Sequence, residues 1–205
     1  MKNFGLLRQS FLFVISFVVI LSIMLSGCEN SKEKNEIRAK YPLITSTQFA
    51  LDVASFDFEE LITYSPDIVE ISVVEVLPDY SVNFIDEENE INSTLIFHQY
   101  KAKIISNLSD TKLNMASDGT IIICHNSMFD GSYPELSVGM NAICSLEAAS
   151  GPHKGKYLFY NKAFYYVDNG LALAAYEGDT SIAAISCNKD ELINKITSIR
   201  KQNAK

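Results

Sequence analysis

Short strand-like segments separated by turn signals fill the chain between residues 68 and 176. They are rich in Val, Ile and aromatic residues, or alternate apolar with polar residues, and Gly, Pro, Asn and Asp stand between them. This pattern is typical of antiparallel strands and predicts a small closed or partly open β-barrel. The expected strands are 68–77, 95–105, 120–124, 140–146, 157–160, 164–167 and 171–176.

The connections between these strands carry recognisable turn residues. Pro78-Asp79 is expected to turn the chain after the first strand, and residues 85–92 are expected to form an acidic loop. Residues 150–155, SGPHKG, are predicted to be a hairpin tip. Asp168-Asn169-Gly170 is the strongest hairpin signal, because Asn-Gly suits the positive φ angles of a two-residue turn.

One helix is predicted at each end of the β region, which makes the fold mainly β (α+β). Residues 55–65 contain Asp57 and Glu60 in a capping-box pattern. At the C-terminus, Asn188 is a good N-cap residue for the second helix. The apolar residues of that helix recur on one face, so we expect it to dock on the barrel. This face comprises Leu192, Ile193, Ile196 and Ile199.

Four segments carry a resemblance to a group of known proteins. They read SPDIVEISVVEVL (65–77), HQYKAKIISNL (98–108), YPELSVGMNAICSL (133–146) and VDNGLALAAYEGD (167–179). Their order resembles that of uncharacterised extracytoplasmic proteins of Gram-positive bacteria with an OB-like barrel. The resemblance implies a small antiparallel OB-like β-barrel and implies no catalytic residues.

The N-terminal segment is built like an export signal. Lys2 and Arg8 provide a positive start, and Phe11–Leu25 is an apolar run of 15 residues broken only by two serines. A membrane-spanning helix, the alternative, needs about 20 apolar residues. Residues 1–27 are therefore predicted to be a signal peptide.

The residues that end this segment are Leu25-Ser26-Gly27-Cys28. They resemble the lipobox of bacterial lipoproteins. The resemblance implies cleavage between Gly27 and Cys28 and a diacylglyceryl group on the Cys28 sulfur, since two acyl chains suffice for stable anchoring. The protein is then expected on the cell membrane, facing the extracytoplasmic side. Residues 28–40 would be the lipidated cysteine and a solvated polar tether, and residues 41–205 a single domain.

The formal net charge of the chain is −8. Removal of Lys2 and Arg8 with the signal makes the remainder more acidic still. Because non-specific binding to nucleic acid depends on basic surface, we expect no nucleic-acid partner.

Cysteines and histidines are few, and their spacing indicates neither a metal site nor a cofactor. Besides Cys28 there are Cys124, Cys144 and Cys187, an odd number that cannot all pair within one chain. We favour buried apolar roles for all three. The alternative is a disulfide between Cys124 and Cys144, which export permits. Cys124 and His125 could form a metal-binding or nucleophile pair, but adjacent strand residues point to opposite faces. The three histidines, His98, His125 and His153, lack metal-finger and His-Glu-x-x-His spacing, which favours structural or surface roles.

Aromatic residues concentrate between residues 157 and 166, beside the Gly-rich tip. Exposed tyrosines are good contact residues for proteins, peptides and sugars, so outward-facing members would form a binding surface. The alternative is that they pack in the core. The residues proposed for binding are Tyr157, Tyr160, Phe164 and Tyr166.

The function expected from the sequence is that of a non-catalytic binding or accessory module at the cell surface. The alternative is a small cell-surface hydrolase that uses His125 or His98. A hydrolase would bring one of these histidines together with both a Ser or Cys and a carboxylate, whereas a binding module would expose an aromatic patch.

Overall fold

The computed structural model describes residues 35–36, 38–41, 43–44, 57–86, 91–176 and 187–203. The chain separates into two compact units, residues 1–40 and 41–205. In the first unit, residues 35–36 and 38–40 of the predicted tether are helical and mostly exposed, and opposite charges four residues apart favour a helix there. Residues 1–27 and Cys28 lie outside the described residues. Among the helices that are described, none is long and apolar enough to cross a membrane.

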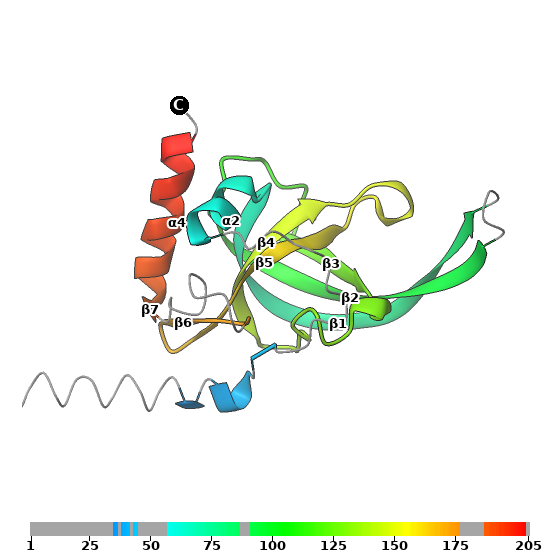
Figure 1. Cartoon of the computed structure of the whole chain (residues 1–205), viewed down its shortest axis with the longest axis horizontal. Coiled ribbons are helices and arrows are strands. Elements are labelled where there is room, and N and C mark those ends of the chain that lie inside the picture. Colours follow the sequence, from blue (N-terminus) through cyan, green and yellow to red (C-terminus); the bar gives the residue numbers. More distant parts are fainter. Residues whose placement is uncertain are drawn as a thin grey trace, which may run out of the picture. The chain divides into compact units, whose positions relative to one another are not determined.

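The second unit is built around one sheet (Figure 1). The described part of this unit is mainly antiparallel β, with α-helix before the first strand and after the last, as predicted. In chain order its elements are α2 (Phe58–Tyr64), β1 (Asp67–Asp86), β2 (Ile91–Asn107), β3 (Thr120–Asn126), η1 (Ser127–Phe129), β4 (Asn141–Ala148), η2 (Gly151–His153), β5 (Tyr157–Asp168), β6 (Leu171–Ala174), β7 (Cys187–Asn188) and α4 (Lys189–Asn203).

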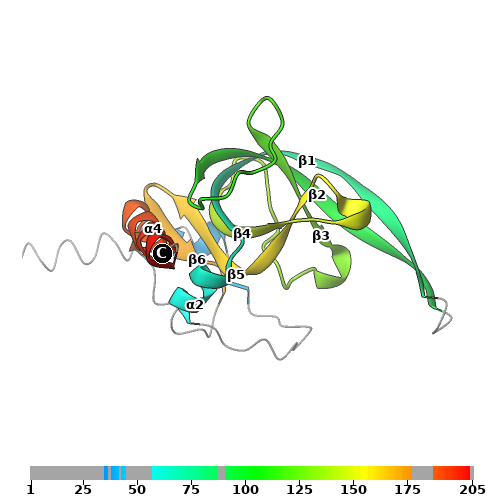
Figure 2. The same ribbon diagram turned by 90° about the horizontal axis from the view of Figure 1, so that it is seen from above.

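The strands pair in the order β3-β2-β1-β4-β5-β6-β7, and neighbours in this order are antiparallel. β3 also pairs in parallel with β5, through Ile123 with Tyr157 and Cys124 with Leu158. Pairing therefore runs from β1 through β2, β3, β5 and β4 back to β1. Figure 2 shows these strands from above, with α2 and α4 on one side of them.

β1 and β2 are much longer than predicted, at 20 and 17 residues. Their far ends form a two-stranded ribbon that protrudes beyond the other strands (Figure 1). The turn predicted at Pro78-Asp79 is wrong, because the chain stays in β1 and the register shifts between Leu77 and Tyr80. Such a β-bulge accommodates proline, which cannot donate to the ladder. The predicted acidic loop is also shorter, since Ile85 pairs with Asn92.

Other local predictions are confirmed or adjusted. Asn169 and Gly170 form the predicted hairpin turn, with φ of 48° and 78°. The two strands expected at 157–160 and 164–167 are one strand, β5, which crosses from its pairing with β3 to its pairing with β6. Residues 150–155 connect β4 to β5 as predicted and contain the short helix η2.

Both predicted helices are present. The Asp57 side chain accepts from the Glu60 backbone N–H at 2.8 Å, and the Glu60 side chain accepts from the Asp57 N–H, which completes the capping box of α2. α4 docks as expected: Leu192 and Ile196 are fully buried, in one cluster with residues from α2 and from the sheet. That cluster includes Leu61, Ile62, Ile68, Ile143, Tyr165 and Ala174.

Two of the cysteines have the apolar role that the sequence favoured. Cys124 and Cys144 are both buried and both free thiols. The side chain of Cys187 lies outside the described residues.

Candidate functional site

Two histidines lie directly opposite each other on β2 and β3. The antiparallel register pairs His98 with His125, and pairs Tyr100 with Ile123 two residues further along. Directly opposed residues share one face of a sheet, so both imidazoles lie on the face that carries Tyr100 and Ile123. Their ring centroids are 5.2 Å apart.

Asp130 joins the two histidines from the segment that follows β3. The short helix η1 reverses the chain there: the Asn126 side chain accepts from the Met128 N–H, and the Asp130 N–H donates to the Ser127 carbonyl. One carboxylate oxygen of Asp130 lies 3.2 Å from His98 Nε2 and the other lies 3.2 Å from His125 Nε2. Both Nε2 atoms therefore face the same carboxylate.

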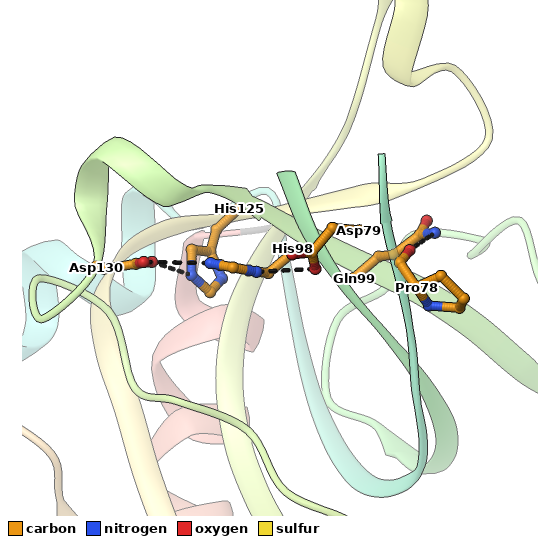
Figure 3. A network of polar contacts seen from close by, with 6 residues as sticks. All are labelled: Pro78, Asp79, His98, Gln99, His125 and Asp130. Carbon is orange, nitrogen blue, oxygen red and sulfur yellow. Dashed lines mark hydrogen bonds and ion pairs between the residues drawn. The ribbon is translucent and has the colours of Figure 1, made fainter. Parts of the chain in front are cut away.

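Asp79 completes a row of four side chains, which Figure 3 shows as Asp130, His125, His98 and Asp79. Its Oδ1 lies 2.9 Å from His98 Nδ1. Asp79 stands in the bulge of β1, next to Pro78, whose carbonyl accepts from the Gln99 side chain at 2.6 Å. Because a bulge re-aims the side chains around it, the irregularity in β1 is what directs this carboxylate at His98.

The two histidines have contrasting surroundings. His125 is 6% exposed and packs near the rings of Tyr100, Tyr133 and Phe159, at centroid distances of 5.9, 6.0 and 6.3 Å. Burial lowers the pKa of His125, whereas the hydrogen bond with Asp79, together with the nearby Asp130, raises the pKa of His98. His125 is thus enclosed by aromatic rings, and His98 is a rim residue held between two carboxylates.

A second polar group lies on the opposite face of the same strands. The Tyr80 hydroxyl is 2.6 Å from His153 Nδ1 and 3.3 Å from Cys124 Sγ, and the Lys156 ammonium lies 3.1 Å from the centre of the Tyr80 ring. Cys124 and His125 therefore point to opposite faces, as the sequence predicted. Burial raises the pKa of the Cys124 thiol, which leaves it a poor nucleophile.

The aromatic residues predicted to form an outward-facing surface lie mostly in the core. Tyr157, Phe164 and Tyr166 are buried, and only Tyr160, at 41% exposure, faces solvent. The expectation of a shared exposed patch was wrong because β5 is an interior strand, paired with β4, β6 and β3, and is covered on both faces over residues 163–167.

From the sequence, His98 and His125 were expected in structural or surface roles and Asp79 in a turn. The signal that was available is the antiparallel pairing expected between the strands at 95–105 and 120–124. The pairing alone does not give the register, and it is the register that places His98 opposite His125. Comparison with models of known protein families and with curated proteins found no match. The function is therefore inferred from the residues of this chain.

Proposed function

We propose that the chain is an extracytoplasmic lipoprotein, anchored in the cell membrane by a diacylglyceryl group on Cys28, whose folded domain is a binding or accessory module. The observation that carries this proposal is the order of four features: a basic start, the apolar run Phe11–Leu25, the small residues Ser26 and Gly27, and then a cysteine. Two acyl chains give anchoring without a transmembrane segment.

We further propose that the domain is an OB-like barrel. Support comes from the pairing circuit β1-β2-β3-β5-β4-β1, with the β3–β5 contact parallel and the other four antiparallel. Proteins of the OB-fold class bind their ligands on strands 2 and 3 and on the loops that join strands 1–2 and 4–5. In this chain the β4–β5 connection brings His153 against Phe97 of β2, with ring centroids 4.2 Å apart.

Two observations favour a binding role over the hydrolase alternative. In the described part of the chain, no serine hydroxyl or cysteine thiol hydrogen-bonds to His98 or His125. Their polar contacts are with the carboxylates of Asp79 and Asp130, and their rings contact each other. The protruding part of the β1–β2 ribbon also carries Phe84, which is 49% exposed and shares one face with the partly exposed Val82 and Leu95. Exposed apolar patches commonly mark surfaces for protein or peptide partners. The net charge of −8 supports the exclusion of nucleic acid.

Cys28→Ala is expected to release the protein from the membrane fraction and to abolish its labelling by radioactive palmitate, because the variant has no thiol to acylate. Cell fractionation with a carbonate wash makes the measurement. Cys187→Ala is the matched control, since it removes a cysteine outside the signal, and it should leave membrane retention and labelling unchanged. Full retention of Cys28→Ala after the wash would contradict the lipid anchor and indicate that the apolar N-terminal segment stays in the bilayer.

A further inference from the structure

We propose that His98, His125 and Asp130 bind one divalent transition-metal ion of the zinc class. This inference goes beyond the proposed function and does not depend on the lipid anchor. Each residue offers one ligand atom, and these atoms all lie within 4.8 Å of one another. Imidazole nitrogen and carboxylate oxygen are the ligands that zinc takes in sites with two histidines and one acidic residue.

The separations between ligand atoms are close to those that such an ion requires. Zinc binds nitrogen and oxygen ligands at about 2.0–2.1 Å, so neighbouring ligand atoms of a tetrahedral site lie about 3.3 Å apart. His98 Nε2 is 3.2 Å from one oxygen of Asp130 and His125 Nε2 is 3.2 Å from the other; with one ligand atom per residue, the three atoms lie within 4.8 Å. His98 lies at the rim, so its side chain has room for the small movement that a common centre requires.

The outer contacts orient both imidazoles for this role. In the neutral ring that would bind a metal ion, Nδ1–H donates to Asp79, and Nε2, the ring nitrogen that faces Asp130, is the ligand atom. A carboxylate behind a ligating histidine is the usual second partner in zinc sites, where it fixes the tautomer and raises the basicity of the ligand. His125 is fixed by the rings packed around it, and its Nδ1 has no partner among the described residues, so its polar contact is made through Nε2.

The charge of the cluster suits a dication. Asp79 and Asp130 bring two carboxylates to two imidazoles, and Lys101, on the same strand as His98, pairs with Asp118 at 2.9 Å instead. The side chains of His98 and Asp130 are 29% and 55% exposed, so an ion there has a path from solvent. Three protein ligands leave a fourth position for water or for an oxygen or nitrogen atom of a bound partner, as in open zinc sites.

Zinc titration tests the site. The protein is purified from membranes in detergent, stripped with EDTA and titrated with Zn²⁺ in a calorimeter. We expect one ion per chain in the wild type. His98→Gln and Asp130→Asn are expected to weaken binding at least about 100-fold, and Asp79→Asn about 10–100-fold, the range found for partners behind ligating histidines. These three positions lie at the rim, so the variants should fold; circular dichroism checks this.

His153→Gln is the matched control, because it removes the third histidine, whose ring lies against Tyr80 and Phe97 on the opposite face. It should bind zinc as the wild type does. Co²⁺ in place of Zn²⁺ gives a visible spectrum whose intensity reports a four-coordinate site, and this spectrum should disappear in His98→Gln. Absence of zinc binding by the wild type, unchanged affinity in folded His98→Gln and Asp130→Asn, or equal loss in His153→Gln would each overturn the assignment.

Discussion

Ile196→Ala is expected to lower the free energy of unfolding by about 2–5 kcal/mol, the range for truncating a buried aliphatic side chain. Ile196 is fully buried on the inner face of α4. It belongs to the cluster that also contains Ile62 of α2 and Leu192. An isolated helix of 15 residues is marginal in water, so α4 depends on this packing. Truncation leaves a cavity among residues of three different elements that cannot easily collapse.

Urea unfolding followed by circular dichroism measures this loss. Asn194→Ala is the matched control, since Asn194 lies on the exposed face of the same helix. Its free energy of unfolding should stay within about 0.5 kcal/mol of the wild-type value. Equal, small effects of both substitutions would mean that α4 is not docked on the domain in solution.

Lys189→Met is expected to cost about 2–4 kcal/mol of unfolding free energy. Lys189, the first residue of α4, has its ammonium 3.0 Å from Glu70 Oε1, and the Glu70 side chain is only 5% exposed. Removal of one partner from a buried ion pair leaves the other charge without compensation, at about 3–5 kcal/mol. The side chain of Lys189 is 29% exposed, so water relieves part of this cost and the expected loss is lower.

Two further variants separate this effect from a change in helix stability. Lys195→Met breaks the exposed pair with Glu191 in the same helix and should cost about 0.3–0.5 kcal/mol. Glu70→Gln in the Lys189→Met background removes the uncompensated charge and should recover part of the lost stability. A double variant less stable than Lys189→Met would contradict a penalty that arises from the charge of Glu70.

The elements that could be predicted from the sequence are those with local causes. The capping box of Asp57 and Glu60 marks α2, and the apolar stripe of α4 identifies its buried face. The turn at Asn169-Gly170 follows from backbone preferences alone. Pro78-Asp79 carries an equally clear local turn signal, yet the long pairing of β1 with β2 overrides it and turns it into a bulge.

Features that depend on register and on neighbouring strands were not predictable in the same way. The spacing between His98 and His125 matches no metal motif, because the two residues are brought together by cross-strand register and not by position in one segment. Asp130 reaches them through η1, a short helix that was not among the predicted elements. Likewise, burial of Tyr157, Phe164 and Tyr166 follows from the interior place of β5, which alternation along one strand does not reveal.

The central claim is that Cys28 holds the domain at the membrane. Mass spectrometry of the N-terminal peptide, taken from protein extracted from membranes, tests this claim most directly. The protein is extracted with detergent from cells that produce the full chain and is digested with trypsin. The account predicts a peptide that begins at Cys28 and carries the mass of a diacylglyceryl group on its sulfur. A peptide in which the Gly27–Cys28 bond is intact, or one that begins elsewhere with Cys28 unmodified, would contradict it.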